Sequence, residues 1–218
     1  MKVVVRKDVY NELYDKLFIL KGGVCIGTIS GHSIKTKDNP ARWEVLTDDN
    51  VLKYASEKQR RIYFANKAHY VDSSVKQIQG VNASNYKLIA TSEFNQMDID
   101  IADVNNPIVC KLLKKPVVSI SRHILNPKKH SLSERIIRTS LLPFVFPIIQ
   151  KYGVFAGNRI ESDGTKSTEL IARAKITVKG KVKKVGISVV LKETNSSGVE
   201  FAFISVFPVE SNLIKSYI

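Results

Sequence analysis

Three segments near the end of the chain alternate apolar and polar residues with the period of a β-strand. They constrain the fold more than any other feature, and they cover residues 170–178, 182–191 and 199–209. Gly180 and the cluster Asn195–Gly198 supply the turn residues between them. Because consecutive strands joined by short turns usually pair, this region predicts an antiparallel sheet of three strands, or four with the apolar run Pro116–Ile120.

A helix is predicted just before these strands. Ser131 and Glu134 have the spacing of a capping box, in which each residue's side chain satisfies a free amide of the other. Apolar residues continue at helical spacing, and Pro143 and Pro147 should kink or divide the helix. A helix followed by an antiparallel meander indicates an α+β fold for residues 111–218.

Residues 1–110 predict a second domain of mixed helices and strands, whose role the sequence does not reveal. Apolar spacing favours helices over residues 9–20 and 47–67, and short strands are expected at residues 86–91 and 99–104. The turn residues Asn105–Pro107 place a domain boundary near residue 110.

Charge changes at the same place. Residues 1–110 contain 15 Lys and Arg against 13 Asp and Glu, whereas residues 111–218 contain 19 against 7. Nearly all of the net charge of +14 therefore lies in the second half. A basic domain of this kind favours a polyanionic partner such as nucleic acid.

Several classes of protein are disfavoured. No apolar run approaches the roughly 20 residues that span a bilayer, and the first residues lack the apolar core of a signal peptide. Cys25 and Cys110 have the spacing of neither a metal site nor a disulfide framework. We therefore expect a cytoplasmic protein without a membrane span, while delivery into a target cell remains an alternative.

The sequence predicts neither a metal nor a cofactor. The acidic residues Asp98, Asp100 and Asp103 lack the glycine and the final glutamate of a calcium loop, so a solvated acidic face is expected. The chain contains no P-loop, dinucleotide fingerprint or nucleophile elbow.

The cluster Lys128, Lys129 and His130 is the best candidate for chemistry. Cleavage of RNA without a metal needs a base for the ribose 2′-OH, an acid for the leaving 5′-oxygen and positive charge near the phosphate. Histidine can be either acid or base, and lysine supplies the charge. If Ser131 begins a helix, His130 lies beside the positive helix end, which disfavours the imidazolium and attracts phosphate. The alternative is a solvated basic loop.

Two pairs of residues near this cluster have two interpretations each. Arg135 and Arg138 form either the solvated face of the helix or a phosphate clamp. Ser205 and Phe207 lie on the last strand, where they either line a groove that stacks bases or belong to the core. His123 lies seven residues before His130 and either faces the same pocket or is structural; the structural interpretation is favoured because Pro127 intervenes and a continuous helix face cannot be assumed.

The lysines Lys179, Lys181, Lys183 and Lys184 crowd the turn between the first two strands. They form either an ordinary solvated turn or a patch that follows a nucleic-acid backbone and binds it in a salt-dependent manner.

The order of helix and meander, with Lys129–His130 at the helix and Ser205 on a late strand, resembles the barnase–EndoU–colicin–RelE superfamily of small ribonucleases. The resemblance covers roughly residues 117–209. It is nearest to the colicin D pattern, where an aromatic residue follows the serine by two positions; that residue is Trp in the pattern and Phe207 in this chain. Similar domains occur in phage polyvalent proteins and in contact-dependent toxins.

The resemblance implies a metal-independent endoribonuclease, a toxin or effector that cleaves RNA by attack of the 2′-OH, with tRNA as a candidate substrate. It implies that His130, Lys129 and Ser205 are catalytic, and that Lys128, Arg135 and Phe207 assist in binding. An acidic immunity or inhibitor protein is the expected protein partner.

Two alternatives explain the basic half without catalysis. One is a nucleic-acid-binding accessory protein of a phage or mobile element. The other is a protein-interaction module that inhibits a host complex.

Overall fold

The computed structural model describes residues 4–6, 32–35, 43–46, 57–161, 163–178, 180–195 and 199–209, with side chains from Arg60 onward. The chain divides into two compact units, residues 1–67 and residues 68–218. The helix predicted over residues 9–20 and the turn residues 196–198 lie outside the described residues.

The described residues of the first unit form three short strands and a helix. The strand β2 (His32–Lys35) pairs in parallel with β1 (Val4–Arg6) and antiparallel with β3 (Trp43–Leu46). The helix α3 (Glu57–Lys67) forms the last part of the helix predicted over residues 47–67, and residues 47–56 lie outside the described residues.

The second unit is built on a six-stranded mixed sheet. Its strands are β4 (Val109–Cys110), β5 (Lys115–Ile120), β6 (Val154–Ile160), β7 (Lys166–Val178), β8 (Lys181–Glu193) and β9 (Phe201–Pro208). They lie in the order β4-β5-β9-β8-β7-β6, and neighbours are antiparallel except for the parallel pair of β5 and β9. The α+β class and the three predicted strands, β7, β8 and β9, are confirmed. The sheet exceeds the predicted size because β4 and β6 extend it at its two edges.

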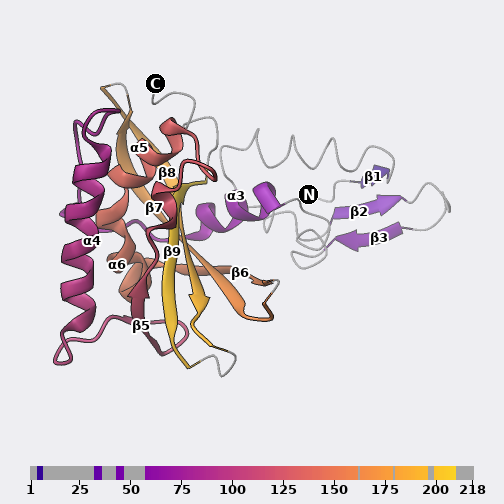
Figure 1. Ribbon diagram of the computed structural model, residues 1–218. Coiled ribbons are helices and arrows are strands. Elements are labelled where there is room, and N and C mark those ends of the chain that lie inside the picture. Colours follow the sequence, from indigo (N-terminus) through magenta and orange to yellow (C-terminus); the bar gives the residue numbers. More distant parts are fainter. Residues whose placement is uncertain are drawn as a thin grey trace. The chain divides into compact units, whose positions relative to one another are not determined.

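Helices cover one face of this sheet (Figure 1). They are α4 (Tyr86–Ala102), α5 (Leu132–Ser140) and the single turn α6 (Val145–Pro147). Tighter or wider turns connect them: the 3₁₀ turns η3 (Arg122–Leu125) and η4 (Leu142–Phe144), and the π-helical turn η5 (Ile148–Tyr152). The helix divides at Pro143 and Pro147 as predicted, since proline lacks the amide hydrogen that the helix interior needs. Among the described residues, no helix is both long and apolar enough to cross a membrane.

The helix α4 replaces the two strands predicted over residues 86–91 and 99–104, so that prediction was wrong. Ala90, Phe94 and Met97 are buried at helical spacing. The pattern is hard to read because Leu88 and Ile99 are apolar but 76% and 64% exposed, which blurs the distinction between the buried and solvent faces.

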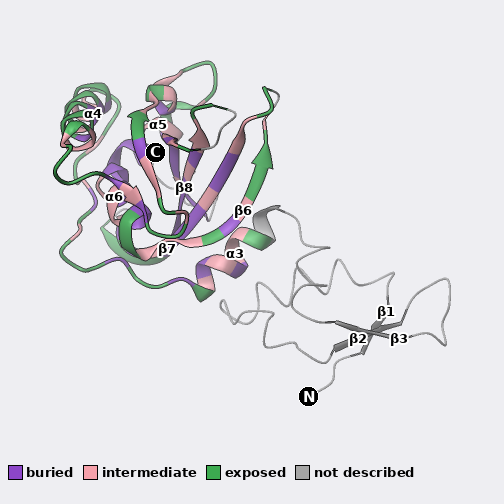
Figure 2. Ribbon diagram, turned by 90° about the horizontal axis from the view of Figure 1, so that it is seen from below, coloured by how far each residue is buried: buried purple, intermediate pink, exposed green. Residues whose placement is uncertain are grey.

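The core lies between the helices and the sheet, where the buried residues of β7 and β8 gather (Figure 2). Phe94 and Cys110 pack in the same apolar cluster as Ile137 and Val189. The segment 68–110 therefore belongs to the second unit, which begins at Ala68 rather than near residue 110. Residues 68–218 carry 21 Lys and Arg against 12 Asp and Glu, so the basic unit also includes the acidic residues of α4.

Candidate active site

A reversal of the chain between η3 and α5 brings two histidines into contact. The Ser121 side chain accepts a hydrogen bond from the His123 amide (3.2 Å) and begins η3. The Asn126 amide then donates to the His123 carbonyl, and the His130 amide donates to the Asn126 carbonyl, both at 3.0 Å. The two imidazole rings consequently meet edge to face, with their centroids 5.0 Å apart and their planes at 84°.

The capping box at the start of α5 is confirmed, and it also holds Glu134 in place. Ser131 Oγ accepts the Glu134 amide hydrogen (3.3 Å), and the Glu134 carboxylate accepts the Ser131 amide hydrogen (2.8 Å). The other carboxylate oxygen, Oε1, then lies 4.0 Å from Nδ1 of His130 and 3.7 Å from Nη2 of Arg138. Glu134 therefore connects the histidine before the helix with the arginine one turn later.

The solvated-face interpretation is wrong for Arg138, which is 8% exposed. Its Nη1 atom donates to Ser205 Oγ (2.5 Å) and to the Val206 carbonyl (3.4 Å), and its guanidinium lies 5.1 Å from the centre of the Phe207 ring. The pairing of β5 with β9 reaches only as far as Phe203, so Arg138 supplies a donor to the edge of β9 beyond that point. This side chain joins α5 to the late strand.

A β-bulge at Ile204 decides which way Ser205 and Phe207 point. Leu191 of β8 lies opposite Phe203, and its neighbour Val190 lies opposite Ser205. Ile204 therefore has no partner on β8 and is the extra residue of the bulge. Simple alternation would put Phe201, Phe203, Ser205 and Phe207 on one face. The bulge instead leaves Phe201 and Phe203 in the core and turns Ser205 and Phe207 to the opposite face.

The surroundings of His130 keep its imidazole neutral. Its side chain is 12% exposed, and burial, with the positive charge of Arg138, lowers the pKa of His130 to about 4. The positive charges of His123 and Arg135 contribute to this lowered pKa, and Glu134 acts in the opposite direction. Nε2 of His130 is buried and has no hydrogen-bond partner among the described residues.

The neighbouring groups respond to the same charges. Burial lowers the pKa of His123, and Lys129 and Arg138 lower it further. Burial alone would raise the pKa of Glu134, but the hydrogen bonds from Ser131 and the charges of Arg138 and His130 outweigh it and leave this pKa below its ordinary value. At neutral pH the site therefore holds two uncharged imidazoles beside an ion pair of buried Arg138 and half-buried Glu134.

The remaining predicted residues of this region lie around the cluster. Lys128 and Lys129 are exposed, and the positive charge of Lys129 reaches the site through its effect on His123. Arg135 donates a hydrogen bond to the Tyr86 hydroxyl, and its guanidinium lies 5.1 Å from the Tyr86 ring centre. Arg135 is therefore half-buried against α4 instead of extending into solvent.

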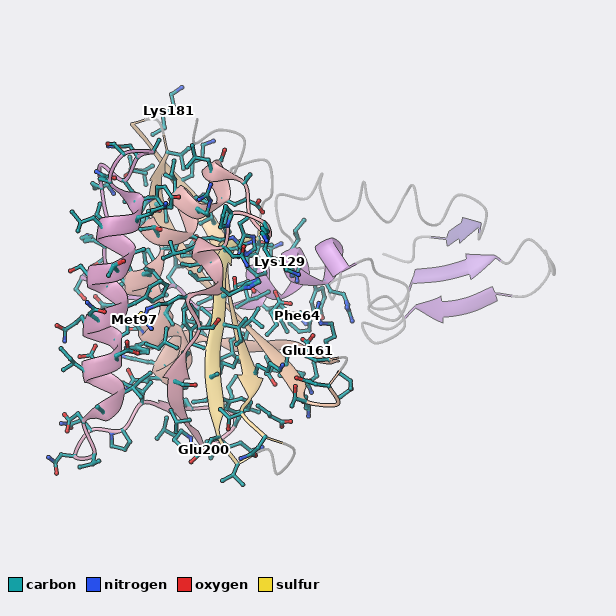
Figure 3. All side chains as sticks on the ribbon, in the orientation of Figure 1. Phe64, Met97, Lys129, Glu161, Lys181 and Glu200 are labelled. Atoms are coloured by element: carbon teal, nitrogen blue, oxygen red, sulfur yellow. The ribbon has the colours of Figure 1, made fainter. Side chains whose placement is uncertain are left out.

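The lysines at the β7–β8 turn do not belong to this cluster. Lys184 lies six residues along β8 from Val190, the partner of Ser205, which corresponds to about 20 Å of strand. Figure 3 shows Lys181 and Lys129 in well-separated parts of the unit.

A structural role was favoured for His123, but the structure places its ring against that of His130. The intervening Pro127 argued against a shared helical face, yet the contact arises from a turn and not from a helix. The sequence signal was Ser121 two residues before His123, together with the turn-forming pair Asn126–Pro127.

The acidic residues of α4 have partners of their own. Asp98 pairs with Arg122 (2.7 Å), and Asp100 accepts a hydrogen bond from Gln96 (2.8 Å). Asp103 accepts hydrogen bonds from the next two asparagines. In the part of the chain that the structure describes, no group of three His, Cys, Asp or Glu is arranged to hold a metal ion.

Comparison with protein-family models, with curated proteins and with solved structures finds no match for this chain. Its function must therefore be inferred from the residues of the site.

Proposed function

We propose that the second unit is a metal-independent endoribonuclease that cleaves RNA by attack of a ribose 2′-OH on the adjacent phosphate. One observation carries this proposal: a chain of contacts from His130 through Glu134 and Arg138 to Ser205. It joins groups that can move protons with groups that can hold a phosphate, although these residues are 75 positions apart in sequence.

The two imidazoles suit the two proton transfers of this reaction. Neutral His130 accepts the proton of the 2′-OH as the bond from this oxygen to phosphorus forms. The bond from phosphorus to the 5′-oxygen breaks, and protonated His123 donates its proton to that oxygen. The products are a 2′,3′-cyclic phosphate and a 5′-hydroxyl, and solvent exchanges the protons afterwards.

A bound phosphate would improve both groups for this task. A pKa of about 4 makes His130 a weak base, and the pKa of His123 is also below its ordinary value. The negative charge of the phosphate favours the protonated form of each imidazole, so it raises both pKa values toward neutrality. The base becomes stronger, and the acid becomes protonated in a larger fraction of molecules.

The other side chains suit phosphate and base contacts. Arg138 uses a lone pair of Ser205 Oγ, so the hydroxyl hydrogen of Ser205 can be donated to a phosphate oxygen. Arg138 and Lys129 stabilise the negative charge that develops on phosphorus. Phe207, half-buried beside Arg138, provides a ring on which a base can stack.

The test is to incubate the purified protein with total tRNA in EDTA and to analyse the RNA ends. Wild-type protein should yield 2′,3′-cyclic phosphate ends, and His130→Ala should yield at most a hundredth of them. His69→Gln, which changes an exposed histidine outside the cluster, is the matched control and should cleave like wild type. Intact RNA with wild-type protein, across several RNA substrates and salt concentrations, would overturn the proposal.

A nucleic-acid-binding protein without catalysis is the second candidate, and the exposed lysines of the β7–β8 turn favour it. It predicts salt-dependent binding that survives His130→Ala but weakens when Lys181, Lys183 and Lys184 are neutralised. If bulk RNA fails to compete for the partner that this unit binds, the third candidate, a protein-interaction module, is favoured instead.

If the protein is a ribonuclease that acts in the cytoplasm or is delivered into a target cell, the cell that makes it needs protection. An acidic immunity or inhibitor protein that covers the basic surface is the partner we propose, because opposite charges speed association and select the partner.

A further inference from the structure

Among the described residues, four lysines at or beside the turn between β7 and β8 are exposed, and Lys179 lies outside the described residues. The four exposed lysines are Lys175, Lys181, Lys183 and Lys184. Lys175 lies directly opposite Lys184 across the two strands. Like charges at opposing positions destabilise a sheet, and none of the four has an acidic partner within 4.0 Å among the described residues.

The strand register divides these lysines between the two faces of the sheet. Lys181 and Lys183 lie opposite Val178 and Ile176, which belong to the core face. Lys184 is the next residue after Lys183, so its side chain lies on the other face of the sheet, and Lys175, directly opposite Lys184, lies on that face too.

The same register places Lys175 and Lys184 on the face that carries the phosphate and base contacts of the site. Ser188 and Val190 alternate in phase with Lys184 along β8, and they lie opposite Phe207 and Ser205. Ser188, opposite Phe207, lies four residues along β8 from Lys184, and Val190, opposite Ser205, lies six residues from it. These separations correspond to about 13 and 20 Å of strand. Arg173 lies between them on this face, next to Lys175 in alternation, with its guanidinium 5.0 Å from the Tyr70 ring centre.

We propose that Lys175 and Lys184 bind the phosphate backbone of the RNA about four to six nucleotides from the phosphate that is cleaved. This inference rests on the proposed function. The number of nucleotides follows from the 13–20 Å separation and a rise of about 3.4 Å per nucleotide in a stacked strand. The preferred substrate is therefore an RNA strand long enough to reach both the site and the lysine pair, and a dinucleotide, which reaches only the site, is cleaved with a higher KM.

The chain offers a matched control for this proposal. Lys175→Gln/Lys184→Gln and Lys76→Gln/Lys111→Gln each remove two positive charges from exposed lysines of the second unit, and Lys76 and Lys111 have no part in the proposed site. Each pair should be assayed on a 12-nucleotide RNA and on a ribodinucleotide, with salt varied from 50 to 200 mM.

The first pair should raise KM for the 12-nucleotide RNA roughly tenfold. The slope of log(kcat/KM) against log[salt] should also become less steep, by the amount expected for the loss of about two phosphate contacts. Cleavage of the dinucleotide should stay within twofold of wild type, and the control pair should stay within twofold on both substrates. Equal losses in the two pairs, no loss in either, or an equal loss on the dinucleotide would each overturn the assignment.

Failure of the proposed function gives a different result. If wild-type protein cleaves neither RNA, binding of the 12-nucleotide RNA is measured by fluorescence anisotropy in the same variants. Binding that is weakened only in the Lys175 and Lys184 pair supports the surface as an RNA contact without catalysis. Unchanged binding in that pair would overturn the inference.

Discussion

Replacing His130 by glutamine should remove a pH dependence of stability that the folded structure imposes. In the folded protein the pKa of His130 is about 4, because of burial and the Arg138 charge, whereas an unfolded histidine has a pKa near 6.5. Between pH 4 and pH 6.5, His130 is protonated in the unfolded chain but not in the folded protein. Stability should therefore be full above pH 6.5, fall as the pH falls from 6.5 to 4, and level off below pH 4.

The size of this effect follows from the shift. Each unit of pKa difference corresponds to about 1.4 kcal/mol, so a shift from 6.5 to about 4 contributes about 3 kcal/mol to the free energy of unfolding at neutral pH. Glu134 titrates in the same range and is coupled to His130, because the charge of each changes the pKa of the other. The difference between the two proteins therefore reports the titration of His130 together with the smaller change that it causes in Glu134.

Urea unfolding of wild type, His130→Gln and the exposed control His69→Gln at half-unit steps from pH 4 to 7.5 measures the difference. Relative to His130→Gln, wild type should lose about 3 kcal/mol between pH 7 and pH 4, whereas His69→Gln should follow wild type. An NMR titration of the folded protein should place the midpoint of the His130 ring signals near 4. A constant difference between wild type and His130→Gln over this range would refute the assignment of a buried neutral imidazole.

Three further substitutions test the local structure through the free energy of unfolding. Arg138→Lys keeps the charge but cannot contact Ser205, Glu134 and the Phe207 ring at the same time, as the guanidinium does, so it should destabilise the protein by about 2 kcal/mol. A change below about 0.5 kcal/mol would contradict these contacts. Ser131→Ala removes the helix cap and should cost about 1 kcal/mol, and an unchanged urea midpoint would argue against the capping box. Gly180→Ala forces an alanine to φ +72° in a turn where its methyl group meets no other atom, so thermal unfolding should show a loss of about 1 kcal/mol from backbone strain alone.

Much of the second unit could be predicted from sequence because its signals are local. The capping box of Ser131 and Glu134 depends on residues three apart, and Gly180 marks the hairpin turn. The alternation of β7, β8 and β9 depends on the period of two that every strand has. The helix α4 was missed because two exposed apolar residues hid its buried stripe, so local pattern and burial disagreed there.

The candidate site was predicted only in part. His130, Ser205 and Phe207 were singled out from the sequence, and the structure connects them through Glu134 and Arg138. Arg138 was expected on a solvated face because a charged residue on a helix is usually exposed. Its burial depends on the end of the β5–β9 pairing, which leaves an edge carbonyl for it to bind.

The sequence by itself determined which segments of the second unit form its capped helix and its meander, and it located the excess of positive charge. These properties follow from the residues of each segment and their near neighbours. Only the tertiary structure decided that His123 meets His130, that the bulge at Ile204 turns Ser205 and Phe207 out of the core, and that Lys184 shares their face while Lys183 does not. Those outcomes depend on how strands far apart in sequence align, and a shift of one residue in that register moves a side chain to the opposite face.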